Sequence, residues 1–157
     1  MDKRCFGLRY FLMLALVVLA GPAAVGMKAG PTESLVGKWT AQSATIKRAG
    51  RPDESKTHPP NELTTEFKED RTFVSVDRAH GEPISVRGVY ELTGEHTLKE
   101  TIADADGPKS FVEKVRGKTV AMEYTLSGNS LTLVSRFGGR DDKGAGQSEV
   151  IFVRVAP

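Results

Sequence analysis

From Leu35 to Val155, short segments of alternating apolar and polar residues follow one another, separated by turn-forming glycine, proline, asparagine and aspartate. A period of two places successive side chains on opposite faces of an extended strand, so each segment presents one apolar face. No intervening stretch has convincing helical periodicity. The sequence therefore predicts an all-β domain, with strands at residues 37–46, 63–67, 72–77, 84–92, 97–102, 120–126, 131–137 and 149–155.

About eight strands with mostly short connections indicate an antiparallel meander. An open meander would leave two unpaired edges, which promote aggregation, whereas closure removes both. A closed barrel of about eight strands has a filled interior or holds one small ligand. We therefore expect an eight-stranded up-and-down barrel over residues 35–156. Its longer connections are a polar, proline-rich loop at 48–61, a loop at 104–117 in which 111–115 is either a helical turn or irregular, and a loop at 138–147.

The first 26 residues have the features of a secretory signal peptide. Lys3, Arg4 and Arg9 give a basic start, residues 11–20 form an apolar core, and Ala24-Val25-Gly26 is a small-x-small cleavage site. The core is shorter than the ~20 apolar residues that a membrane-spanning helix needs. We expect cleavage after Gly26, a short flexible lead at 27–34 and a periplasmic or secreted protein, with an uncleaved membrane anchor as the alternative.

Beyond the signal peptide the chain is neutral and has no cysteine. Residues 1–26 hold three of the 22 Lys and Arg residues and one of the 20 Asp and Glu residues, so 19 of each remain. A neutral domain has no electrostatic basis for binding nucleic acid or an anionic membrane. Cys5 is the only cysteine and lies before the apolar core, so the exported domain must fold without disulfides.

Gly37-Lys38-Trp39 opens the first predicted strand, on which Trp39, Ala41 and Ser43 share one face. Leu35, the segments 88–92, 106–108 and 124–133, and the terminal Val153-Arg154-Val155 complete a pattern that resembles a bacterial lipocalin-like (calycin) family of small exported domains, planctomycete type. The resemblance covers residues 35–155 and implies a calycin barrel with no established activity. It also implies structural roles for Gly37, Trp39 and Arg154, with the arginine packed over the indole and Trp39 closing one end of the barrel.

The start of the chain also resembles intracellular fatty-acid-binding proteins, which place two helices after the first strand. Residues 48–61 contain Pro52, Pro59 and Pro60 and cannot form two helices. The terminal Arg-x-Tyr carboxylate clamp of that family is absent, because Val155 and Ala156 follow Arg154. We therefore set that family aside.

Apolar and aromatic residues on the predicted strands are the candidates for lining a ligand site. They are Phe67, Phe73, Tyr90, Met122, Tyr124, Leu133 and Phe137. An apolar pocket with a few polar groups is the usual form of a small-molecule site, and the two tyrosines would supply hydroxyls. The leading hypothesis is non-enzymatic binding of a small apolar or amphipathic ligand. The alternative is a solid barrel that acts as a protein-interaction or inhibitor module through the loops 48–61 and 138–147.

The three histidines lie on different predicted loops, and we expect them to be solvated rather than to converge on a metal. They are His58, His80 and His96. Residues 104–107 with Glu113 match a calcium loop only in part, because Ile102 occupies the first ligand position. We therefore predict no metal and no cofactor.

No catalytic constellation emerges from the remaining polar residues. Four strand glutamates could serve in acid–base chemistry, and no spacing selects a pair among them: Glu66, Glu91, Glu100 and Glu123. No serine lies in a nucleophile motif, and no glycine-rich loop has phosphate-binding spacing. We therefore expect a monomeric protein that is not an enzyme, with a small hydrophobic ligand or an exported protein as its partner.

Overall fold

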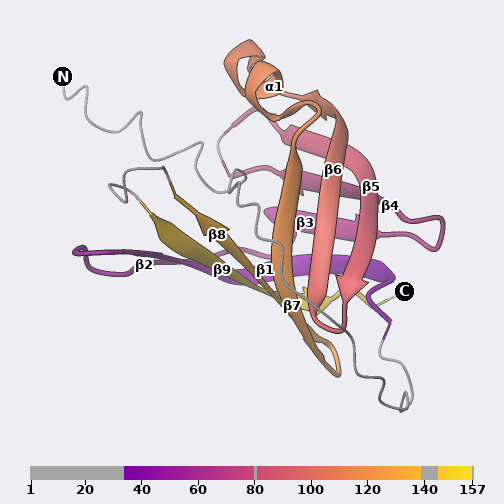
Figure 1. Ribbon diagram of the computed structural model, residues 1–157, viewed down its shortest axis with the longest axis horizontal. Coiled ribbons are helices and arrows are strands. Elements are labelled where there is room, and N and C mark those ends of the chain that lie inside the picture. Colours follow the sequence, from indigo (N-terminus) through magenta and orange to yellow (C-terminus); the bar gives the residue numbers. More distant parts are fainter. Residues whose placement is uncertain (1–33, 80, 139–144, 157) are drawn as a thin grey trace.

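The strands form one antiparallel sheet that closes on itself. The computed structural model describes residues 34–79, 81–138 and 145–156 (Figure 1). Its strands are β1 (Gly37–Arg48), β2 (Glu54–Thr57), β3 (Leu63–Phe67), β4 (Thr72–Asp77), β5 (Ile84–Gly94), β6 (Thr97–Asp106), β7 (Thr119–Ser127), β8 (Ser130–Phe137) and β9 (Gly146–Arg154). From β3 to β9 each strand pairs with the next, while β1 pairs with both β3 and β9. Eight strands therefore make the closed up-and-down barrel that the sequence predicts.

The ninth strand corrects the expected loop at 48–61. β2 pairs antiparallel with residues 43–46 of β1 and lies outside the ring of eight. Its sequence, Glu-Ser-Lys-Thr, has no apolar residue and three of its four residues are exposed. Hydrophobic periodicity could not reveal such a strand, because pairing with β1 holds it in place rather than burial of its side chains.

The connection at 104–117 is also more regular than expected. β6 continues to Asp106, and a short helix, α1 (Lys109–Val115), follows it and buries Phe111 and Val115. Seven residues are too few for a helix to be stable by itself, so these two buried side chains attach it to the barrel. Figure 1 shows α1 beyond the ends of β6 and β7.

The two ends of the barrel have different connections. We call one the helix end, because α1 and the β1–β2 connection lie there. We call the other the Trp39 end, because β1 starts there and β9 finishes there, next to the tight turns β3–β4, β5–β6 and β7–β8. Among the described residues no helix has the length and apolar character to cross a membrane. The predicted signal peptide, the expected lead up to residue 33, His80, residues 139–144 of the 138–147 loop and Pro157 lie outside the described residues.

Two irregularities decide which residues face inward. In β1 the register with β9 shifts between Ala41 and Ser43, so Ala44 and Ile46, not Ser43, continue the buried face of Trp39 and Ala41. A second shift lies between Arg87 and Gly88 of β5, where Ala103 of β6 is the extra residue, and the same two strands shift again between Leu92 and Gly94, next to their turn. Each bulge inserts one residue and reverses the phase of the alternation beyond it. The expected grouping of Ser43 with Trp39 is wrong for this reason.

The residues of the Gly-x-Trp signature meet at the Trp39 end. Trp39 is fully buried, and its indole Nε1 donates a hydrogen bond of 2.9 Å to the Leu35 carbonyl. The Arg154 guanidinium lies 4.2 Å from the centre of the Trp39 ring and donates to the carbonyls of Val36 and Ser34 at 2.8 and 2.6 Å. A Cβ on Gly37 would overlap the guanidinium, so glycine leaves the space that the arginine occupies.

Candidate functional site

A cavity of about 90 Å³ lies in the interior of the barrel. Residues of β3, β4, β6, β7, β8 and β9 line it from inward-facing positions. The apolar members are Leu63, Met122, Leu133, Val150 and Phe152, and the polar members are Thr65, Ser75, Asp77, Glu100, Ser135 and Ser148. The lining therefore combines an apolar surface with hydroxyl and carboxyl groups, which is the composition of a small-molecule site.

Glu100 is placed in the cavity by the alternation of β6. Leu98 and Ile102, two residues away on either side, are buried on the same inner face. The register pairs Glu100 with Tyr90 of β5 and Val120 of β7, so both neighbouring strands hold its backbone in the wall. In the ring of eight strands β6 lies opposite β1, and the carboxyl group therefore extends from one wall into the interior.

The Glu100 carboxyl has no charged partner. Burial alone raises its pKa from 4.5 to about 8, and no described residue offers it a hydrogen bond or a positive charge. Its side chain retains some exposed surface because it borders the cavity rather than close-packed atoms. At neutral pH Glu100 is therefore mostly a neutral carboxylic acid, since ionisation would leave a charge without water or a counter-ion.

Two pairs of hydroxyls accompany Glu100. Thr65 and Ser75 are cross-strand partners on β3 and β4, and their side-chain oxygens lie 2.6 Å apart in a buried hydrogen bond. Ser135 and Ser148 are cross-strand partners on β8 and β9. These two strand pairs flank β1 in the ring, so both face the wall that carries Glu100.

A second carboxyl, Asp77, borders the cavity at the end of β4. Its Oδ1 accepts a hydrogen bond of 2.8 Å from the Ala79 backbone nitrogen. The described residues that line the cavity include no lysine, arginine or histidine. The only ionisable groups of the lining are therefore acids.

The seven residues predicted to line a site are divided among several places. Met122 and Leu133 line the interior cavity. Tyr90 and Tyr124 line a separate pocket of about 310 Å³ at the Trp39 end, and Phe137 packs with Ile46 in a small separate cluster.

The remaining two, Phe67 and Phe73, are fully buried in the core beside Tyr90. The Phe67 ring centre is 5.1 Å from that of Tyr90 and 6.4 Å from that of Phe73. These rings fill the interior between the cavity and the Trp39 end, and they line neither pocket.

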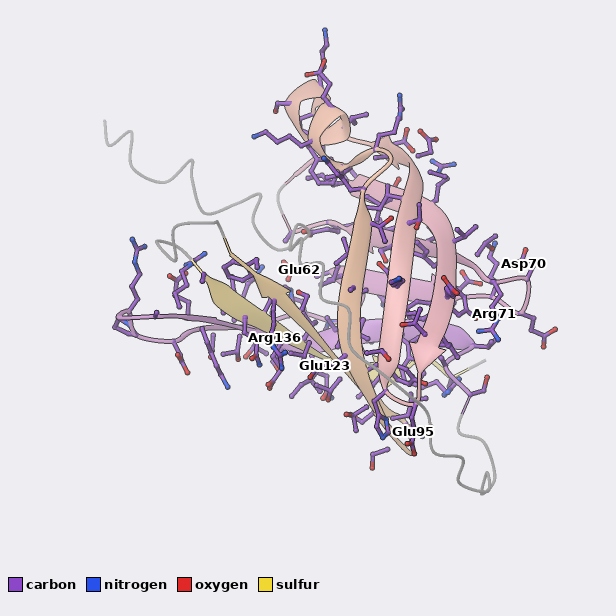
Figure 2. All side chains as sticks on the ribbon, viewed as in Figure 1. Glu62, Asp70, Arg71, Glu95, Glu123 and Arg136 are labelled. Carbon is purple, nitrogen blue, oxygen red and sulfur yellow. The ribbon has the colours of Figure 1, made fainter. Side chains whose placement is uncertain are left out.

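In the pocket at the Trp39 end, the hydroxyl of Tyr90 is already engaged. The Tyr90 hydroxyl already donates a hydrogen bond of 2.8 Å to the Lys68 carbonyl, and burial raises the pKa of this hydroxyl. The Arg71 guanidinium lies 5.4 Å from the centre of the Tyr90 ring. Figure 2 shows Asp70 and Arg71 at the turn between β3 and β4, and Arg71 lines this pocket.

The polar residues of the cavity lining were not among those predicted from the sequence to line a site. Of the four strand glutamates, Glu66, Glu91 and Glu123 are exposed, and Glu100 is the one that lines the cavity. The signal was present, because Glu100 occupies the apolar phase of its strand between Leu98 and Ile102. A polar residue in that phase marks a group that the fold turns inward.

The structure corrects the expected solvation of His58, which is buried. Its backbone nitrogen donates to the Gln42 carbonyl at 2.8 Å, because the unexpected β2 brings this segment against β1. Its Nδ1 lies 2.7 Å from Glu62, and Lys56 lies 3.2 Å from the same carboxylate oxygen. Burial raises the pKa of Glu62, but the bonds from His58 and Lys56 lower it more, so the net shift is downward.

The other two candidate metal-binding features are His96 and the partial calcium loop at 104–107. His96 is exposed. In the partial calcium loop, Asp104 pairs with Arg116 at 2.9 Å and Asp106 pairs with Arg87. A backbone hydrogen bond from Ala105 and the contact with Arg116 hold the pKa of Asp104 below its usual value. The described part of the chain contains no group of three or more metal-ligating side chains.

Comparison with known proteins supports the fold and adds no activity. No protein-family model matches the sequence, and no curated protein matches it. Among solved structures, the chain is similar to a lipocalin-like protein from Bacteroides uniformis, at 17% identity and a TM-score of 0.50. The match covers 77% of this chain and 98% of that one. The chain therefore has a lipocalin-like barrel fold.

Proposed function

We propose that this protein is an exported, non-enzymatic binding protein that holds a small amphipathic molecule in the interior cavity of its barrel. The observation that carries the proposal is the cavity itself, with apolar side chains beside hydroxyls and a buried carboxyl. A barrel that served only as a scaffold would gain stability from an apolar filling, because an unpartnered buried polar group is costly. We also propose that the chain belongs to the bacterial lipocalin-like family of exported domains, as its N-terminal signal suggests.

The volume of the cavity limits the ligand. The interior cavity measures about 90 Å³. Pockets for drug-sized ligands measure ~300–1,000 Å³, so a large lipid does not fit inside. Small ligands gain at most about −1.5 kcal/mol per non-hydrogen atom. A ligand of about five such atoms would therefore bind with a Kd no lower than a few micromolar.

A variant that fills the cavity tests the proposal. Val150→Phe adds a ring at the cavity wall, whereas Ile151→Phe adds the same ring at the adjacent position, which faces outward and is half-buried. We expect a screen of small amphipathic molecules by ligand-observed NMR to find binders of the wild type. Val150→Phe should lose them and Ile151→Phe should keep them.

Circular dichroism and thermal unfolding provide the control, because overpacking costs ~1–3 kcal/mol and the variants must be compared in the folded state. A folded Val150→Phe protein that binds as well as the wild type would place the ligand elsewhere and overturn the proposal. So would a wild-type protein that binds nothing in the screen.

β2 supports a second candidate, a protein-interaction module. It stands at the end of the strand order, and only one of its edges pairs with a described strand. An extended segment of a partner protein can add to such an edge through backbone hydrogen bonds. Replacing Ser55 with proline should abolish capture of an exported partner and leave small-molecule binding intact, whereas unchanged capture would argue against this edge.

A further inference from the structure

We infer that the ligand of the interior cavity is a small organic cation, an alkylammonium ion of about four to six non-hydrogen atoms, and that Glu100 binds its charge. This inference rests on the proposed function and names the chemical class of its ligand. It follows from three features of the cavity: the sign of its ionisable groups, the missing partner of Glu100 and the arrangement of the hydroxyls.

The ionisable groups of the lining select the sign of the ligand charge. Glu100 and Asp77 are acids, and no described lining residue is a base. A carboxylate ligand, such as the head group of a fatty acid, would meet two acids and no counter-charge. A cation would instead lie beside two acids that can pair with it. Such ion pairs are stronger where water is excluded.

The missing partner of Glu100 points to the same class. A buried acid is normally paired or hydrogen-bonded, yet no described residue offers this carboxyl a hydrogen bond or an opposite charge, and burial raises its pKa to about 8. An ammonium group in the cavity would supply both a charge and hydrogen-bond donors to the carboxylate. The ligand thereby replaces the counter-ion that the fold itself does not provide.

The hydroxyls and apolar side chains complete the match. An ammonium group has three N–H donors and no acceptor. Thr65 and Ser75 use one hydroxyl hydrogen between them, which leaves lone pairs on both oxygens to accept from the ligand. Leu133, Val150 and Phe152 offer apolar surface to a short alkyl chain.

Binding of the cation releases a proton. Below about pH 8 the Glu100 carboxyl carries its proton, which must leave for solvent when the ammonium ion binds, while the ligand keeps its own proton up to about pH 10. The affinity should therefore rise about tenfold between pH 6 and 7, and level off above pH 8.

The other titratable or charged groups of the inner wall are spread over five strands. Asp77 on β4 borders the cavity, Tyr90 on β5 and Tyr124 on β7 line the pocket at the Trp39 end, Arg154 on β9 lies over Trp39, and Arg48 on β1 pairs with Glu54. Only Asp77 shares the cavity with Glu100, and the experiment below therefore separates the two acids by mutation.

The test compares three probes of matched size: n-butylammonium, 1-butanol and butyrate. Binding to the purified protein is measured by isothermal titration calorimetry and NMR at pH 6, 7 and 8 and constant ionic strength. We expect n-butylammonium to bind at least tenfold more tightly than 1-butanol at pH 8, and butyrate not to bind. Calorimetry in buffers of different ionisation enthalpy should show release of close to one proton at pH 7.

Variants assign the effect to Glu100. Glu100→Gln should lose at least tenfold of the ammonium affinity together with its pH dependence, whereas Asp77→Asn should keep the pH dependence. Glu123→Gln is the matched control, because Glu123 is exposed on β7 and pairs with Arg136 at 2.9 Å outside the barrel (Figure 2). It should bind like the wild type.

The outcomes separate this inference from the proposed function. If 1-butanol or butyrate binds as tightly as the ammonium ion and Val150→Phe blocks it, the cavity is the ligand site and the cation inference is overturned. An ammonium affinity that Glu100→Gln leaves unchanged overturns it as well. If none of the three probes binds, the cation inference fails, and the wider screen with Val150→Phe decides the proposed function independently.

Discussion

At the scale of single residues, Glu100 is the most informative position. It occupies an inner-face position of β6, where Leu98 and Ile102 are the expected kind of residue. Because burial raises its pKa, Glu100 is a neutral acid inside the folded protein, and the free energy of unfolding falls when the pH rises. A group held this way without a partner fits a role in binding better than a role in stability.

The raised pKa of Glu100 predicts how stability depends on pH. The folded protein binds this proton up to about pH 8 and the unfolded chain only up to its ordinary value of 4.5. Below pH 4.5 Glu100 is protonated in both states and does not lower the free energy of unfolding. As the pH rises from 4.5 to about 8, the free energy of unfolding declines by up to about 4 kcal/mol, because only the folded state keeps the proton. Glu100→Gln lacks this group and should lose less stability over the same range.

Urea unfolding of both proteins at pH 5, 6, 7 and 8 measures this difference. The wild-type midpoint should decline relative to the variant at each step. Parallel midpoints across the range would mean that Glu100 ionises with an ordinary pKa, and would remove its description as a buried neutral acid.

The positions of some residues in the fold were predictable from the sequence, and those of others were not. Trp39 and Arg154 were predicted to pack together because a family resemblance connects these two positions, which are far apart in the chain. In the structure the Arg154 guanidinium carbon lies 4.2 Å from the centre of the Trp39 ring. Glu100 could have been placed from alternation, because it occupies the apolar phase of its strand between Leu98 and Ile102, but the strand glutamates were assessed only as acid–base pairs. His58 was misjudged because its burial depends on the pairing of β2 with β1.

At the scale of elements, the bulges control the shape of the barrel wall. The shift between β5 and β6 lies where Gly88 meets Ile102, and the strands approach closely there. A Cβ on Gly88 would overlap the backbone carbonyl of Thr101, which cannot move aside as a flexible side chain could. Glycine is therefore required by close approach of the neighbouring backbone rather than by an unusual backbone angle.

Gly88→Ala tests this requirement. The added methyl group should force β5 and β6 apart and destabilise the protein by about 2 kcal/mol or more, because overpacking of this kind strains the backbone. Val89→Ala on the same strand is the control, since Val89 is 52% exposed. Chemical unfolding measures both, and equal stabilities would show that the wall accommodates a side chain at Gly88.

The elements themselves were largely predictable, and the exceptions share a cause. The eight barrel strands alternate apolar and polar residues, so their positions follow from the sequence. However, β1, β5 and β6 extend two to four residues beyond the expected ends, and β9 begins three residues early, inside the expected loop at 138–147. β2 and α1 are short and depend on contacts with the rest of the fold. The sequence pattern therefore did not reveal β2, whereas the helix at α1 was one of the two alternatives for residues 111–115.

At the scale of the whole molecule, closure and filling act together. The pairing of β1 with β9 removes the free edges of the ring, and the aromatic core around Trp39 fills part of the interior. The interior cavity measures about 90 Å³, so under the proposed function it takes a much smaller ligand than a long-chain lipid. The comparison at 17% identity bears on the fold alone and leaves the ligand to the lining residues.

The location of a bound ligand tests the central claim most directly. Methyl-resolved NMR of the protein titrated with n-butylammonium at pH 8 distinguishes the two pockets. The account predicts shifts of the methyl groups of Leu63, Leu133 and Val150, which line the interior cavity. Unchanged signals from these residues, with shifts instead at Leu92 and Leu126 of the Trp39-end pocket, would contradict it.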